Sequence, residues 1–141
     1  MCRPQRRLAE TRAVSVVLIV EDDQGIQDVL RFLAEANGMR VVAANTCDCA
    51  IREAESHRPD LVIVDLGLPD RDGIQLIRNI RAWSRLPIIV LTARTLESQR
   101  RAAFEAGADD YVTKPFSAPE LLARMKALLH RSASSGLSDG V

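Results

Sequence analysis

The sequence predicts an α/β protein built around a five-stranded parallel sheet with helices on both faces. Five short apolar runs recur along the chain, and stretches with helical spacing separate them. Parallel strands need crossover connections, and right-handed helical crossovers cover both faces of the sheet. Strands that are buried on both faces form continuous apolar runs such as Val-Val-Leu-Ile-Val, without polar alternation.

The predicted strands are dominated by valine, isoleucine and leucine. In chain order they are Val16–Val20, Val41–Ala44, Leu61–Val64, Pro87–Leu91, and Tyr111–Val112 with their neighbours. Apolar residues between the strands recur at i, i+3, i+4 and i+7, which predicts one buried face per helix. The clearest faces are Ile26, Val29, Leu30 and Leu33, and near the end Leu121, Leu122, Met125, Leu128 and Leu129.

Glycines and capping residues mark the expected helix ends. Gly38 and Gly107 each follow a helical stretch, where a residue with a left-handed backbone conformation commonly ends the helix. Helix starts are expected at small polar side chains that accept from free amides of the first turn. The candidate caps are Thr46 or Asp48, Asp72, and Ser117 in a Ser-Ala-Pro-Glu capping box.

Residues 14–131 carry all of the predicted elements and have the length of one domain. We predict a flexible N-terminal extension at residues 1–13, which are polar and basic, and a linker or tail at residues 132–141, which are rich in Ser and Gly. Lys+Arg and Asp+Glu both number 19, so the charge balance indicates no general nucleic-acid or membrane surface. The three cysteines lack zinc-site spacing and no apolar run approaches the ~20 residues of a membrane span, so a reducing, cytoplasmic setting is expected.

Polar residues follow four of the strands, at the edge where parallel sheets bind ligands. Glu21 and Asp22 follow the first strand, and Asp65 follows the third. Thr92 comes directly after the fourth strand, and Lys114 lies just beyond the fifth. Three carboxylates so close need a cation, and hard oxygen ligands favour Mg²⁺. An aspartate beside Mg²⁺ and a lysine can act as a nucleophile toward a phosphoryl group.

The strings VLIVEDD, DLGLPDRDG, IIVLTAR and GADDYVTKPF resemble the receiver domains of bacterial response regulators, the input modules of two-component systems. The four motifs follow one another in that family's order over about residues 15–131. The connecting residues resemble the OmpR/PhoB branch, whose output is a winged helix that binds DNA, and within it the regulators of potassium-uptake operons. The resemblance implies a flavodoxin-like (βα)5 fold with strand order 2-1-3-4-5, and a receiver domain at residues 14–131.

The resemblance also implies the roles of the site residues. Asp65 would accept a phosphoryl group from a sensor histidine kinase, and Lys114 would pair with that group. Mg²⁺, for which Mn²⁺ can substitute, would be bound directly by Asp22, Asp65 and the main-chain oxygen of Gly67, with Glu21 reaching the metal through water. The chain would then be a switch that phosphorylates from a donor and slowly dephosphorylates itself, and not an enzyme with a separate substrate.

In this family a threonine and an aromatic residue form the switch, and their counterparts here are Thr92 and Tyr111. The bond Lys114–Pro115 would be cis. Phosphorylation would favour a homodimer through the face made by the fourth helix, fifth strand and fifth helix. The charged residues that would cross-pair there are Arg100, Asp109, Asp110, Glu120, Arg124 and Arg131. DNA binding is expected only of a C-terminal domain absent from this chain.

Several simpler interpretations stay open at this point. Asp65 can be a turn cap, Lys114–Pro115 a plain helix-entry turn, Tyr111 a half-buried strand residue, and the charged set an ordinary solvated face. The chain can be a stand-alone receiver, or a receiver that works without phosphorylation. A Mg²⁺-dependent phosphatase of the haloacid dehalogenase kind would need a second aspartate two residues after Asp65, where this chain has Gly67.

Overall fold

Five parallel strands form one sheet in the order β2-β1-β3-β4-β5, which confirms the predicted topology. The computed structural model describes the backbone of residues 14–140 and the side chains of residues 14–131, so the predicted extension at residues 1–13 lies outside the described residues. The strands are β1 (Val16–Val20), β2 (Arg40–Ala44), β3 (Leu61–Val64), β4 (Ile88–Thr92) and β5 (Asp110–Thr113).

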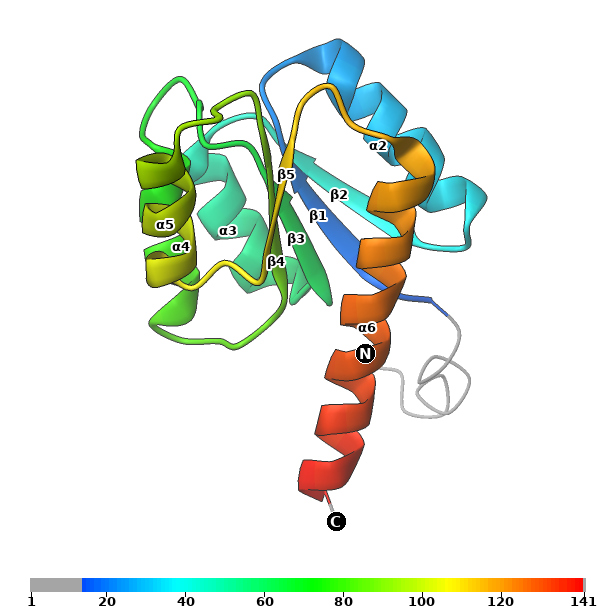
Figure 1. The fold of residues 1–141 in the computed structure, drawn as a ribbon. Coiled ribbons are helices and arrows are strands. Elements are labelled where there is room, and N and C mark those ends of the chain that lie inside the picture. Colours follow the sequence, from blue (N-terminus) through cyan, green and yellow to red (C-terminus); the bar gives the residue numbers. More distant parts are fainter. Residues whose placement is uncertain (1–13, 141) are drawn as a thin grey trace.

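Each strand lies within one residue of its predicted position. Strand β4 begins and ends one residue later than predicted, so it includes Thr92. Thr92 is in register with Thr113 of β5. Val20 is in register with Ala44 on one side and with Val64 on the other. The carboxyl ends of the strands therefore meet at one edge of the sheet, the upper edge in Figure 1.

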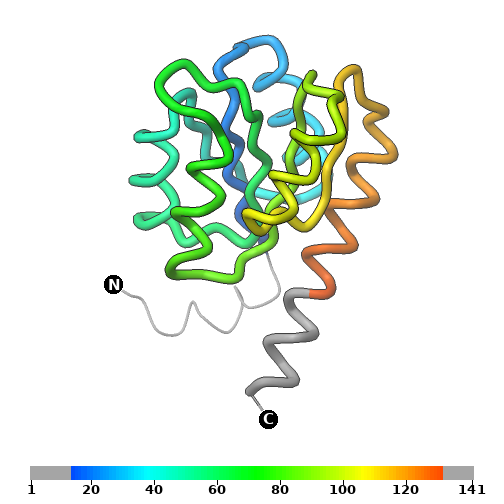
Figure 2. The backbone as a smooth tube through the Cα atoms, turned by 60° about the vertical axis from the view of Figure 1, so that its left-hand side comes forward, coloured from blue at the N-terminus to red at the C-terminus, as the bar shows by residue number. Residues whose placement is uncertain are grey.

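Helices cover both faces of the sheet, three on one and two on the other (Figure 1). They are α2 (Gln24–Ala36), α3 (Cys47–His57), α4 (Gly73–Arg81), α5 (Glu97–Ala106) and α6 (Ala118–Gly140). On the first face α3 lies beside α4, and α4 beside α5 (Figure 2). On the second face α2 lies beside α6. The backbone of α6 continues through residues 132–140, and their role as a linker stays a prediction.

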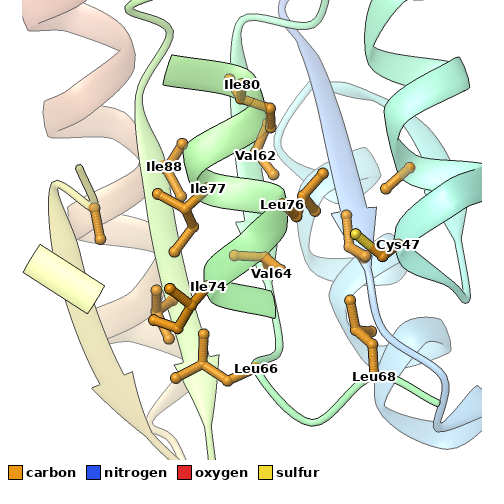
Figure 3. Packing of buried hydrophobic residues seen from close by; sticks show 14 of the residues in the cluster. Cys47, Val62, Val64, Leu66, Leu68, Ile74, Leu76, Ile77, Ile80 and Ile88 are labelled. Carbon is orange, nitrogen blue, oxygen red and sulfur yellow. The ribbon is translucent and has the colours of Figure 1, made fainter. Parts of the chain in front are cut away.

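The sheet separates two hydrophobic clusters, because successive side chains of a strand point to opposite faces. Leu18 and Val20 belong to the cluster under α3, α4 and α5, whereas Val17 and Ile19 belong to the one under α2 and α6. Figure 3 shows the first cluster, in which α4 packs its isoleucines and leucine against β3 and β4. Each fully buried leucine or isoleucine stabilises the fold by about 1.5–3 kcal/mol.

Helix ends follow the capping rules at most of the predicted positions. Thr46, and not Asp48, caps α3 by accepting from the Cys49 amide. Asp72 caps α4, and Gly38 and Gly107 have the positive φ angles of 82° and 123° that favour glycine. At α6, Ser117 accepts from the Glu120 amide at 3.3 Å, while the Glu120 carboxylate turns outward to Arg124. Asp23, which the sequence did not single out, caps α2 through the Ile26 amide.

Candidate phosphoryl-accepting site

The predicted acidic residues converge at the carboxyl edge of the sheet. Glu21, Asp22 and Asp65 each present a carboxylate oxygen, and these oxygens lie within 4.8 Å of one another. The Lys114 Nζ donates to Glu21 Oε1 at 2.8 Å and to Asp65 Oδ2 at 3.1 Å. The structure therefore brings together residues that are up to 93 positions apart in the chain.

The sheet itself holds these side chains in place, because its backbone hydrogen bonds continue one residue beyond the strand ends. The Glu21 amide donates to Ala44 O, and the Asp65 amide to Val20 O. On the far side, the Lys114 amide donates to Thr92 O at 2.9 Å. Groups fixed by main-chain bonds keep their relative positions without depending on loop conformation, which suits a site that must bind charge.

The Lys114 ammonium stabilises the Asp65 carboxylate. Burial raises the pKa of the Asp65 carboxyl, but hydrogen bonds from the Gly67 amide, at 3.2 Å, and from the Lys114 and Thr92 side chains outweigh it, so this pKa lies below its ordinary value. Burial holds the pKa of Glu21 above its ordinary value, and the bond from Lys114 only partly offsets this. Burial lowers the pKa of Lys114, but its bonds to the two carboxylates raise it overall. Asp65 is thus ionised at neutral pH and available as a nucleophile.

The donor set fits a hard divalent cation. Asp65 is partly accessible, with 12% of its side chain exposed, and Asp22 is exposed, so both can be reached from solvent. Glu21 is buried at 2% exposure and bound to Lys114, which suits an indirect role. Oxygen ligands of this kind suit Mg²⁺, which typically uses one or two carboxylates together with water. The predicted ligation by the main-chain oxygen of Gly67 stays a prediction.

Both predicted switch residues lie in the interior and contact the same loop. Thr92, at the end of β4, is 1% exposed, and its hydroxyl accepts from the Arg94 amide at 3.4 Å. Tyr111 is buried on β5, and its hydroxyl donates to the main-chain oxygen of Arg94 at 2.9 Å. The Lys114–Pro115 bond is cis, as predicted. Tyr111 is therefore anchored at its polar tip, and is more than a half-buried strand residue.

The loop between Asp65 and α4 is held by contacts that sequence reasoning missed. Its Asp70 carboxylate accepts from the Cys47 amide at 2.8 Å and from the Asp48 amide at 3.0 Å, at the start of α3. The amide of Gly73 donates back to Leu66 O at 2.8 Å. The DLGLPDRDG string was visible in the sequence, but the partners of its Asp70 carboxylate lie in a different segment, the start of α3.

The charged residues predicted to cross-pair between two copies have partners within one chain. Arg124 donates to both oxygens of Asp110, at 2.7 and 2.8 Å, and to Glu120 at 2.9 Å. Asp109 accepts from Arg81 at 2.9 Å, and Arg131 lies 3.6 Å from its other oxygen. In addition, the Arg100 guanidinium lies over the rings of Phe104 and Tyr111, at 5.4 and 5.8 Å. Cross-pairing in a dimer stays a prediction.

Residues 17–126 match the family model described as the response regulator receiver domain. The chain belongs to the response regulator receiver family. The match covers more than half of the chain and includes every residue of the acidic site. It does not support the alternative of a haloacid-dehalogenase-like phosphatase, consistent with Gly67 at the position of the missing second aspartate.

This receiver domain is 51% identical over 123 residues to the KDP operon transcriptional regulatory protein KdpE of Escherichia coli K12, over 87% of this chain and 55% of that protein. It is 44% identical to KdpE of Mycobacterium tuberculosis, over 86% of this chain and 54% of that protein. It is also 42% identical to the phosphate regulon regulator PhoB of Escherichia coli K12, over 82% of this chain and 52% of that protein. The chain thus spans about half the length of these relatives, and the resemblance to the OmpR/PhoB branch is confirmed.

Solved structures agree with this assignment. The BeF3-activated N-terminal receiver domain of Klebsiella pneumoniae RstA matches with a TM-score of 0.78 and 32% identity, over 81% of this chain and 97% of that chain. A CheY-like receiver domain protein of Methanospirillum hungatei matches with a TM-score of 0.83 and 27% identity, over 86% and 98%. The chain is therefore the receiver domain of a two-component response regulator.

Proposed function

We propose that this receiver domain takes a phosphoryl group onto Asp65 from a phosphohistidine of a sensor histidine kinase, in a Mg²⁺-dependent reaction. The observation that carries this proposal is the position of Asp65, which is partly exposed, ionised, beside two further acids and 3.1 Å from the Lys114 ammonium. A carboxylate in this setting combines nucleophilicity with a nearby positive charge for the transferred oxygens.

In the transfer, an Asp65 oxygen attacks phosphorus and forms an acyl phosphate, while the P–N bond breaks and its electron pair stays on the donor imidazole. Lys114 and the Thr92 hydroxyl are the groups of this chain that would contact the phosphoryl oxygens. A bound Mg²⁺ would neutralise charge on those oxygens, held by Asp22 and Asp65, with Glu21 in support and the main-chain oxygen of Gly67 as a further ligand. Mn²⁺ satisfies the same oxygen donors. Slow autodephosphorylation at this site would reset the switch.

The output of the switch is a change in association. We infer that phosphorylated receiver domains pair through the face formed by α5, β5 and α6, with Thr92 and Tyr111 carrying the change from Asp65. The charged residues of that face would fix register and contribute about 0–1 kcal/mol per exposed pair. Similarity to KdpE supports a cytoplasmic, potassium-responsive regulator with a KdpD-like kinase as donor, and DNA binding by a domain of the longer protein.

The phosphorylation step is tested by incubating the chain with acetyl phosphate and Mg²⁺ and measuring intact mass. Wild type should gain one phosphate, and Asp65→Asn or a chelator should abolish the gain. Asp22→Asn should weaken Mg²⁺ binding, whereas Asp23→Asn, which keeps a side chain able to cap α2, should not. No added mass on wild type, or the same addition on Asp65→Asn, would contradict the proposal.

The coupling step is tested on the same samples by size-exclusion chromatography with light scattering. Thr92→Ala should still be phosphorylated on Asp65 but should dimerise less at equal occupancy. Dimerisation that is unchanged in Thr92→Ala would show that the signal leaves the site by another route.

A further inference from the structure

Arg94 has a set of contacts that the proposed transfer reaction does not use. It lies between β4 and α5, with 31% of its side chain exposed. Its guanidinium donates to the Asp72 carboxylate at 2.8 Å, to the Gln99 side-chain oxygen at 2.9 Å and to Leu66 O at 3.3 Å. These three acceptors belong to the cap of α4, the first turn of α5 and the residue that follows Asp65. One side chain thus connects three segments around the site.

Asp72 links Arg94 to the start of α4. Its Oδ1 accepts from the Ile74 amide at 2.9 Å as the helix cap, and its Oδ2 accepts from Arg94. A carboxylate fixed by a helix terminus is a rigid anchor, because rotating it would break the cap. The planar guanidinium, in turn, suits acceptors that lie in different directions.

The main chain of Arg94 contacts both predicted switch residues. Its carbonyl oxygen accepts from the Tyr111 hydroxyl at 2.9 Å, and its amide donates to Thr92 Oγ1 at 3.4 Å. Holding the guanidinium at three acceptors therefore restrains the loop that carries this carbonyl. A tyrosine hydroxyl that enters the interior needs such an acceptor, since burying it without one is costly.

We propose that Arg94 is a positioning residue that holds Tyr111 in its buried rotamer. Its guanidinium does so by fixing the loop after β4 to Asp72 and to the main-chain oxygen of Leu66. This clamp connects the loop that follows Asp65 with the face formed by α5, β5 and α6, along a path of side-chain and main-chain hydrogen bonds. Its structural part stands on these contacts alone, and its link to signalling rests on the proposed function.

A purely electrostatic role for Arg94 makes a different prediction. If only its positive charge mattered, Arg94→Lys would leave Tyr111 as buried as in wild type, because lysine keeps the charge. Lysine lacks the fork that reaches Asp72, Gln99 and the Leu66 carbonyl together. Because Asp72 and Arg94 are partly exposed, at 40% and 31%, we expect their loss to change the buried-to-exposed ratio of Tyr111 by only about threefold.

Tyr111 is the only tyrosine in the chain, which allows a direct measurement. In protein labelled with 3-fluorotyrosine, a single ¹⁹F resonance reports Tyr111, and its H₂O/D₂O isotope shift reports solvent exposure. The experiment uses the whole chain at neutral pH without Mg²⁺ or phosphodonor. Arg94→Lys and Asp72→Asn should each increase exposure, and the double variant should add little more. Asn at position 72 can still cap α4, so this variant separates the clamp from helix stability.

Arg101→Lys is the matched control, since it makes the same chemical change at an exposed position on α5. It should leave the resonance where it is in wild type. The proposal is overturned if Tyr111 stays as buried in Arg94→Lys as in wild type, if only Asp72→Asn changes it, or if Arg101→Lys changes it equally. None of these outcomes depends on phosphorylation.

A second measurement tests the link to signalling. With beryllofluoride as the phosphoryl mimic, Arg94→Lys should need about threefold more mimic than wild type for half-dimerisation. An unchanged midpoint, with Tyr111 demonstrably released, would overturn the link while leaving the clamp in place. A wild type that binds no mimic would instead refute the proposed function, and the ¹⁹F result would still decide the clamp.

Discussion

Gly73 is the position at which the start of α4 touches the main chain of Asp65, the proposed phosphoacceptor. A Cβ added there would lie 2.6 Å from the main-chain oxygen of Asp65 and 2.8 Å from Leu66 Cα. Both are backbone atoms, so no side-chain rotation can relieve the overlap. Gly73→Ala must therefore move either the first turn of α4 or the peptide that carries Asp65.

The expected cost follows from two opposing effects. Overpacking in a tight interior costs about 1–3 kcal/mol, and backbone contacts place this case in the upper half of that range. Replacing glycine also lowers the entropy of the unfolded chain, which stabilises by about 0.4–1 kcal/mol. We expect Gly73→Ala to lower the free energy of unfolding by about 1–2.5 kcal/mol. It should also slow phosphorylation of Asp65, because the carboxylate is displaced from Lys114.

Gly67 supplies the matched control within the same loop. Its added Cβ would meet nothing within 4 Å, and its φ lies outside the positive range that disfavours other residues. In urea unfolding, Gly67→Ala should stay within about 0.5 kcal/mol of wild type. If Gly73→Ala proved as stable as Gly67→Ala and accepted phosphate from acetyl phosphate at the wild-type rate, the inferred contact with the Asp65 main chain would be wrong.

Two further predictions concern charge. Lys114→Met removes the ammonium that two carboxylates share, so in chelator it should destabilise the fold by about 1–3 kcal/mol, and added Mg²⁺ should stabilise the variant measurably in thermal unfolding. An unchanged midpoint in chelator would contradict this. Hydrogen bonds from the Cys47 and Asp48 amides lower the pKa of Asp70 below its ordinary value of 3.8. The stability that Asp70 contributes is therefore complete above that pH and is lost as pH falls through the lower folded-state pKa. Asp70→Ala should be less stable than wild type in urea at pH 7, and the difference should shrink in strong acid; a constant difference would refute the assignment.

The fold and the acidic cluster were predictable because each leaves a local pattern. Apolar runs such as Leu61–Val64 identify buried strands, and parallel order then places the residues after them at one edge. Glu21, Asp22 and Asp65 required only that geometry. Thr46 and Asp48 both match a helix cap, and only the structure shows that the helix begins at Cys47, so that Thr46 is the cap.

Contacts between side chains of distant segments left no such pattern. The bond from Arg94 to Asp72 joins residues 22 positions apart, and nothing in the periodicity of either segment marks the pair. The same holds for Arg81, which bonds to Asp109 across 28 positions. The family resemblance implied that Asp110, Glu120 and Arg124 pair between two copies of the chain, whereas in the structure Arg124 bonds to the other two within one chain. Whether such a pair forms within one chain depends on side-chain reach and rotamers, which the sequence does not encode locally.

The division of the interior by the sheet has a consequence for how the domain tolerates change. Ile77 of α4 and Leu121 of α6 belong to hydrophobic clusters on opposite faces of the sheet. Substitutions in separate clusters without shared partners act additively on stability. A lineage can therefore repack the layer behind one face while the other keeps its shape, and the two faces can adapt to different partners independently.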